Sequence, residues 1–189
     1  MKNKTITTVT ILTVVFNTLF FVCLGLYIAK GNQQPYVALF YTSLMFAYHT
    51  DIRLLIAFVL VGTVKNRINI DAKKYDVSDA EFARLSRLSV KKWKDKFIAW
   101  DKNQFVVHSL KDRANFDRVM RNNICAEIIH WTCLVAGMFA ILIGCLLSPT
   151  DWWIFVITAV VVTVYADIPP IIIQRFNRHR LQKLKTRLG

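Results

Sequence analysis

Residues 165–181 have the sequence YADIPPIIIQRFNRHRL, which leads from an apolar segment directly into a basic one. On a helix, Asp167, Gln174 and Arg178 are spaced i, i+7 and i+11, so they share one face. A carboxylate about two turns inside an apolar helix is costly unless it is paired or faces water. The stretch therefore predicts the end of a membrane-spanning helix with a polar face that serves a function.

The rest of the chain has the same membrane character. It has 189 residues, is 54% hydrophobic and carries a formal net charge of +13. Its apolar residues form blocks long enough to cross a bilayer, which needs ~20 residues per helix. We therefore expect a single all-α integral membrane domain with four transmembrane helices, at about 6–29, 36–64, 124–147 and 152–173. A basic cytoplasmic helical segment is expected at 65–122 and a basic cytoplasmic tail at 174–189.

The second apolar block is longer than a bilayer requires. As one helix, residues 36–64 would extend about 43 Å, against a hydrocarbon core of ~30 Å. Either its end projects into the cytoplasm or the helix breaks near Thr50, and we favour projection. In the following segment, Ser78 and Glu81 have the spacing of a helix capping box.

The distribution of basic residues predicts the orientation. The middle segment and the tail hold twenty-one of the twenty-five Lys and Arg residues, whereas the turn at 30–35 holds only Lys30. The positive-inside rule then places both termini in the cytoplasm of a multi-pass protein. Because the basic residues flank apolar blocks, anionic membrane lipid or a phosphorylated substrate is the expected partner, and nucleic acid is not. The oligomeric state stays open.

The cysteines do not suggest a bound metal or a disulfide. Each lies in an apolar block, and none has metal-ligand spacing. A di-metal carboxylate site needs paired ExxH motifs, and this sequence has one. We expect no metal site. The four cysteines are Cys23, Cys125, Cys133 and Cys145.

A second polar stripe lies in the third predicted span. Glu127 and His130 are spaced i and i+3, and Asn123 lies one turn earlier. A rise of 1.5 Å per residue places this stripe at a depth similar to that of Asp167. His49 and Arg53 of the second span reach the same depth if that helix projects. We expect the three helices to bring these side chains together near the cytoplasmic leaflet.

Such a cluster suits the removal of a proton from a substrate hydroxyl. His130 would be the general base, and Glu127 would fix its tautomer and stabilise the imidazolium. Arginine and asparagine side chains could hold a phosphate or an oxyanion. Glu127 and His130 could instead be a buried structural pair, and Asp167 could pair with Arg53 for structure alone. The candidate substrate-binding residues from this pattern are His49, Arg53, Asn123, Asp167, Gln174 and Arg178.

Four stretches resemble the glycosyl-4,4'-diaponeurosporenoate acyltransferase family, small bacterial membrane proteins. They are AYHTDIRL (47–54), VKKWKDK (90–96), ICAEIIHW (124–131) and DIPPIIIQRFNRHRL (167–181). Where the family usually has Tyr and Pro, this chain has Phe176 and His179. The resemblance implies a bacterial cell membrane location and acylation of a lipid-linked sugar or carotenoid glycoside.

The resemblance also extends the candidate site. Arg175 and Asn177 would join Arg178 in contacting the phosphate of the acyl donor or the oxyanion. Lys92 and Lys94 lie where an acidic cytosolic co-substrate such as acyl-CoA would approach, although a lysine run more often faces lipid headgroups. No tightly bound cofactor is expected.

Two functional hypotheses follow. In the first, the protein is an acyltransferase that moves a fatty acyl group from a thioester donor to a hydroxyl of a glycosylated lipid. In the second, it is a non-catalytic membrane protein that binds lipid, confers immunity or scaffolds a partner. A transporter is a weaker third option, because four spans without an inverted repeat offer little for alternating access.

Overall fold

A computed structural model describes residues 4–31, 33–94, 113–148 and 150–188 of the chain. All regular secondary structure in these ranges is helical, which confirms the all-α fold class. Residues 95–112 of the predicted cytoplasmic segment, including Lys96, lie outside the described ranges. The chain divides into two compact units. Unit 1 comprises residues 1–56 and 132–166, and unit 2 comprises residues 57–131 and 167–189.

Within the described residues, four helical stretches are long and apolar enough to cross a membrane, as predicted. Two of them are longer than expected. Helix α5 (Arg113–Leu147) begins inside the predicted cytoplasmic segment and continues into the third span without a break. Helix α7 (Ile168–Leu188) continues the fourth span through the predicted tail. The four candidate spans are Thr10–Lys30, Gln34–Thr63, Arg113–Leu147 and Trp152–Thr186.

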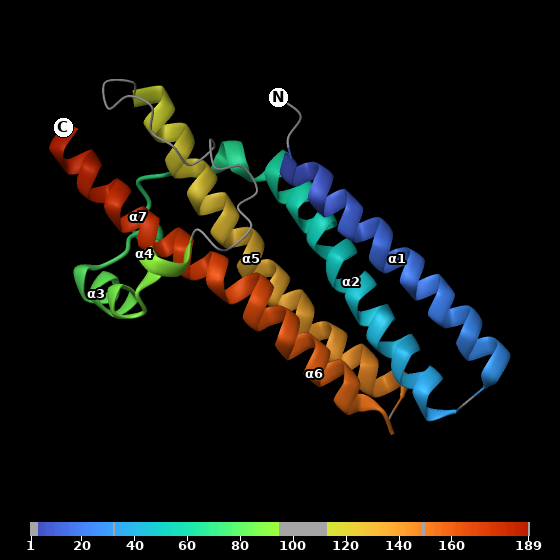
Figure 1. The fold of residues 1–189 in the computed structure, drawn as a ribbon. Coiled ribbons are helices and arrows are strands. Elements are labelled where there is room, and N and C mark those ends of the chain that lie inside the picture. The colour runs from blue at the N-terminus through green and yellow to red at the C-terminus, as the bar shows by residue number, and fades with distance from the viewer. Residues whose placement is uncertain (1–3, 32, 95–112, 149, 189) are drawn as a thin grey trace. The chain divides into compact units, whose positions relative to one another are not determined.

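In unit 1, helices α1 (Lys4–Lys30) and α2 (Gln34–Thr63) run side by side in opposite directions (Figure 1). Aromatic rings join them, with Phe16 and Phe46 stacked at a centroid distance of 5.2 Å. Helix α2 is continuous through Thr50, whose hydroxyl donates to backbone carbonyls one turn earlier. The alternative of a break at Thr50 is therefore wrong, while projection of the helix end stays a prediction.

Unit 1 also contains a tight hairpin formed by the end of α5 and by α6 (Trp152–Val162). A Cβ atom on Gly144 would lie 2.1 Å from the ring of Phe155, so only glycine allows this approach. In the connecting turn, Ser148 Oγ donates to the buried carboxylate of Asp151 at 2.9 Å, and Thr150 Oγ1 donates to it at 3.2 Å. Close backbone approach at small residues is typical of helices packed within membranes.

Between α6 and α7 the helix widens into a π-helical turn, η5 (Thr163–Asp167). Pro169 and Pro170 explain the position of this turn. A proline has no N–H to donate to the carbonyl four residues earlier, and its ring clashes with that carbonyl. A π-helical turn accommodates this missing hydrogen bond and the steric clash within an otherwise continuous helix. Such turns are frequent at functional sites. The sequence analysis did not anticipate this turn.

In unit 2, short helices pack beside α5 and α7. They are η1 (Lys65–Arg67), η2 (Lys73–Tyr75), α3 (Asp79–Arg87) and α4 (Val90–Trp93). The hydroxyl of Ser78 accepts the backbone N–H of Glu81 at 3.2 Å, which confirms the predicted cap of α3. Phe82 of α3 stacks on Phe176 and His179 of α7. The apolar core of unit 2 includes Ile68, Phe116, Val119, Met120, Ile124 and Leu181.

Candidate functional site

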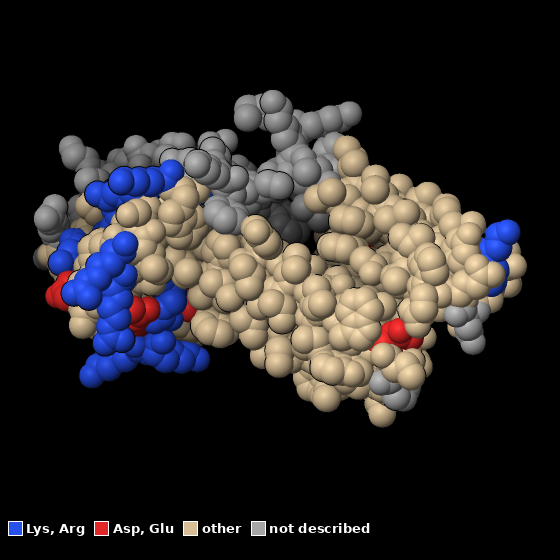
Figure 2. All heavy atoms as spheres, turned by 60° about the horizontal axis from the view of Figure 1, so that its bottom comes forward, with Lys and Arg blue, Asp and Glu red and all other residues tan. Residues whose placement is uncertain are grey.

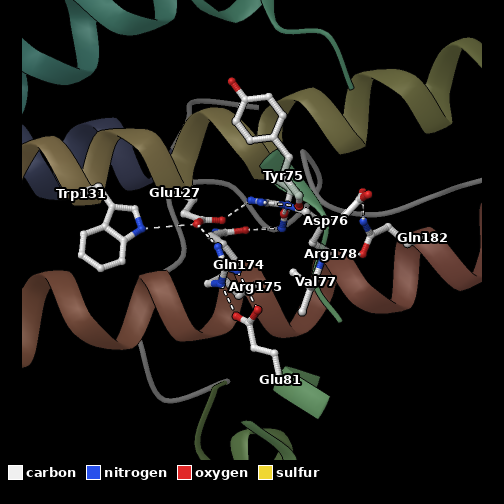
Figure 3. A network of polar contacts seen from close by, with 11 residues as sticks. Tyr75, Asp76, Val77, Glu81, Glu127, Trp131, Gln174, Arg175, Arg178 and Gln182 are labelled. Carbon is white, nitrogen blue, oxygen red and sulfur yellow. Dashed lines mark hydrogen bonds and ion pairs between the residues drawn. The ribbon is translucent and has the colours of Figure 1, made fainter. Parts of the chain in front are cut away.

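Glu127 lies at the centre of a buried polar network in unit 2 (Figure 3). Its side chain is 8% exposed, and it comes from α5. Arg175 donates to Oε1 from Nη1 at 2.8 Å, and Arg178 of the same helix donates to Oε2. Trp131 Nε1 donates to Oε1 at 3.3 Å. The buried carboxylate is therefore paired with two guanidinium groups and bound by an indole.

Arg178 is almost fully buried, with 1% of its surface exposed. Besides Glu127, it binds Asn123 Oδ1 through Nε at 3.2 Å and the backbone oxygen of Tyr75 through Nη1 at 3.1 Å. Asn123 in turn donates to the Gln174 side chain. All three nitrogens of the guanidinium are engaged, so within this network Arg178 joins α5, α7 and the η2 segment.

Arg175 is shared between two carboxylates. Its guanidinium makes a bidentate contact with Glu81 of α3, in which Nη2 donates to Oε2 at 2.8 Å and Nε donates to Oε1. These hydrogen bonds hold the pKa of Glu81 below its ordinary value. The sequence analysis assigned Glu81 only to a capping box. Because 94 residues separate it from Arg175, no local spacing signals the pair.

His130 lies next to Asp167 instead of having Glu127 as its paired carboxylate. Nδ1 of His130 and Oδ1 of Asp167 are 3.5 Å apart. Asp167 is fully buried, whereas 26% of the His130 side chain is exposed. We expected Glu127 to orient His130, and the structure corrects this pairing. The physical reason is that two guanidinium groups from α7 each form a charge-assisted hydrogen bond with the Glu127 carboxylate.

The other candidate residues are placed as follows. His49 and Arg53 belong to unit 1, where Arg53 Nη1 lies 3.0 Å from His49 Nδ1 and donates to the His49 carbonyl at 2.8 Å. Gly137 makes room for the buried imidazole, since a Cβ there would lie 3.1 Å from His49 Cε1. Their convergence with His130 stays a prediction. In unit 2, Asn177 is half-buried on α7.

Lys92 lies in α4 and Lys94 directly follows this helix. Lys92 is exposed, and Lys94, which follows the last residue of the helix, is partly buried. Figure 2 shows several Lys and Arg side chains close to one another, with a few carboxylates among them. Such a surface suits an anionic partner, either a lipid headgroup or a phosphorylated co-substrate.

The two polar stripes therefore meet as predicted. Asn123 of α5 contacts Gln174 of α7, Glu127 contacts two arginines of α7, and His130 approaches Asp167. Three contributors were missed: the Tyr75 carbonyl, Glu81 and Trp131. Trp131 could have been found, because it stands at i+4 from Glu127 on one helix face. The catalytic and substrate-binding roles remain predictions.

Comparison with known protein families gives a match over residues 72–187, which is more than half of the chain. The matched family is described as glycosyl-4,4'-diaponeurosporenoate acyltransferase, which confirms the resemblance seen in the sequence. No curated protein matches the chain. No solved structure matches it either. The matched range contains Glu127, His130 and Asp167, whereas residues 47–54 lie outside it.

Proposed function

The chain belongs to the glycosyl-4,4'-diaponeurosporenoate acyltransferase family, and we propose on this basis that it is a membrane acyltransferase acting on a glycosylated lipid. The acyl group is a fatty acyl chain, and the donor is a thioester such as acyl-CoA. The acceptor is a sugar hydroxyl, with a carotenoid glycoside as the class that the family's description indicates. In the predicted orientation, the reaction takes place at the cytoplasmic leaflet of a bacterial cell membrane.

The observation that carries this proposal is the pairing of His130 with Asp167. A general base must be open to substrate, and a quarter of the His130 side chain is exposed. Its partner must hold the ring and stabilise its positive charge, and Asp167 is fully buried beside Nδ1 at 3.5 Å. Such contacts are often loose before substrate binds and tighten in the reacting complex. In the proposed tautomer, the proton on Nδ1 faces Asp167 and Nε2 is the basic nitrogen.

The proposed reaction is an acyl transfer assisted by this base. His130 Nε2 accepts the proton of the sugar hydroxyl as the hydroxyl oxygen forms a bond to the thioester carbonyl carbon. The carbon–sulfur bond then breaks, and the thiolate leaves with the proton that His130 returns. Asp167 stabilises the transient imidazolium and keeps the ring in one tautomer. The atoms and electrons of this step balance without a metal ion or a redox partner.

The arginines have different parts in this proposal. Arg178 is buried and fully engaged, so it positions α5 against α7 and does not bind substrate. Arg175 is 25% exposed, and one of its two carboxylate partners, Glu81, is 32% exposed. A donor phosphate can therefore compete with Glu81 for this guanidinium. Asn177, Lys92 and Lys94 remain candidate contacts for the same phosphate-bearing group.

The experiment is acyl-product analysis in cells that supply the glycosylated acceptor. His130→Ala should lower the amount of acylated product by about 10²–10⁴-fold, the usual contribution of a general base. Asp167→Asn should also lower the rate, because it removes the charge that stabilises the imidazolium. The amount of each variant in the membrane fraction serves as the control. Normal product from His130→Ala at normal abundance would refute the proposal.

The same experiment tests the non-catalytic alternative. If the polar network served stability alone, His130→Gln and Asp167→Asn would lower the amount of protein in the membrane. Product per molecule of protein would then stay constant. A loss of product per molecule contradicts that alternative.

A further inference from the structure

A cavity of about 250 Å³ lies between α3 and α7 in unit 2, outside the Glu127 network. Phe82 of α3 and Leu184 of α7 give it apolar walls. Its other lining residues, His179, Arg180 and Lys183, all come from α7. Sites for whole small molecules usually measure ~300–1,000 Å³. The cavity is therefore suited to one group of a larger ligand.

The aromatic wall of the cavity is rigid. The rings of Phe82 and His179 are stacked, with centroids 4.0 Å apart and an interplanar angle of 12°. Phe82 also stacks on Phe176 with centroids 5.0 Å apart. His179 is held from its other edge, because Nε2 lies 2.8 Å from Asp79 Oδ1. A wall fixed in this way needs no ordering when a ligand arrives, which favours binding.

The polar side of the cavity carries positive charge. Arg180, Lys183 and Leu184 are spaced i, i+3 and i+4, so they share one face of α7. Lys183 Nζ lies 2.9 Å from Asp79, which His179 also contacts. Arg180 is exposed, and no described carboxylate lies within ion-pair distance of it. Lys183 is therefore paired with a carboxylate, whereas the Arg180 guanidinium is available to an anion.

We propose that the cavity between α3 and α7 binds the phosphate of an amphiphilic ligand through Arg180 and Lys183. The planar guanidinium of Arg180 matches phosphate oxygens in a bidentate manner, and the ammonium of Lys183 adds a point charge. Phe82 and Leu184 contact the apolar or aromatic group next to that phosphate. The ligand is either an anionic phospholipid or a nucleotide-bearing acyl donor, since both present this chemistry. The acyl-donor ligand rests on the acyltransferase reaction proposed above, whereas the phospholipid ligand does not.

The test uses the full-length protein in nanodiscs and two probes. Coenzyme A is titrated by calorimetry into phosphatidylcholine nanodiscs, which represents a nucleotide-bearing donor. Retention of phosphatidylglycerol from mixed nanodiscs, measured by native mass spectrometry, represents a lipid headgroup. The cavity variants are Arg180→Gln alone and Arg180→Gln with Lys183→Gln. The charge-matched control combines Arg84→Gln and Arg87→Gln, two exposed positions on α3 outside the cavity.

The proposal expects at least one probe to bind the wild-type protein. The double cavity variant should weaken that probe's binding by about tenfold or more, because two charge-assisted hydrogen bonds are lost. Arg180 is exposed and forms no hydrogen bond or ion pair with a described residue, so the single variant Arg180→Gln should fold like the wild type and report on ligand binding. The control pair should change binding by less than about twofold, because neither charge lines the cavity and exposed charges are screened by salt. Binding of neither probe, unchanged binding in the cavity variants, or an equal loss in the control would each overturn the proposal.

Discussion

Replacing Glu127 by glutamine should destabilise the protein because it leaves a buried positive charge without its carboxylate. Arg178 is 1% exposed, and its remaining acceptors, Asn123 and the Tyr75 carbonyl, are neutral. Removing one partner of a buried ion pair costs about 3–5 kcal/mol. Glutamine keeps one oxygen that can accept a hydrogen bond, so we expect a value near the lower end. That is a large share of the ~5–15 kcal/mol that stabilises a typical domain.

The charge on Arg178 is the cause of this cost, and a second substitution can test that. Arg178→Gln combined with Glu127→Gln removes both buried charges and leaves two amides that can bond to each other. Replacing both partners of a buried ion pair often changes the free energy of unfolding very little. The double variant should therefore be more stable than Glu127→Gln alone, which is a favourable coupling of two neighbouring sites.

The assay is equilibrium unfolding of the purified protein in detergent, followed by tryptophan fluorescence and helical circular dichroism. Five tryptophans provide the signal, and Trp131 lies directly against Glu127. If Glu127→Gln lowered the free energy of unfolding by less than about 1 kcal/mol, Arg178 would not be left as a buried cation without a carboxylate, and the reasoning would be refuted. A double variant less stable than Glu127→Gln would likewise refute the reasoning.

Two further perturbations address other parts of the structure. Gly144→Ala should cost about 1–3 kcal/mol by overpacking, because the new Cβ would lie 2.1 Å from the Phe155 ring. Gly25→Ala is the control, since a Cβ there meets nothing within 4 Å, and the same unfolding assay compares the two. The Glu81–Arg175 contact should stabilise α3 fully at pH values above 4.5, the ordinary pKa of Glu. This stabilisation should be lost as the pH falls through the lowered pKa that Glu81 has in the folded protein. Hydrogen-exchange protection of α3 should thus hold from neutral pH to about pH 5 and fall below it. Glu81→Gln should lower that protection at neutral pH as well, and equal protection in both proteins would contradict the assignment.

Hydropathy and helix geometry were sufficient to predict much of this molecule. The apolar blocks fixed the membrane class and the number of candidate spans, since ~20 apolar residues are needed to cross a bilayer. A rise of 1.5 Å per residue placed Asp167 and His130 at a similar depth, and they lie 3.5 Å apart. The cap of α3 followed from the spacing of Ser78 and Glu81, because a capping hydrogen bond depends on local sequence.

The partners of individual side chains could not be predicted in the same way. Spacing on a helix determines which face a residue occupies, but it does not determine which opposite charge reaches it. Glu127 and His130 share a helix, yet Glu127 binds arginines of α7 while Asp167 lies beside His130. Glu81 belongs to the network through a contact spanning 94 residues. The length of α5 was also missed, because the polar residues before its apolar block suggested a separate helix.

The turn between α5 and α6 has a consequence for how the chain enters the membrane. In the predicted orientation this turn must cross the bilayer during insertion, and it carries the acidic residue Asp151. Ser148 and Thr150 already bond to that carboxylate, and Gly144 lets Phe155 close the two helices together. When a helical hairpin satisfies its own polar groups by internal hydrogen bonds, the free-energy cost of moving it out of water is smaller. The pair is thus suited to translocate as one preassembled element, with the charge shielded on the way.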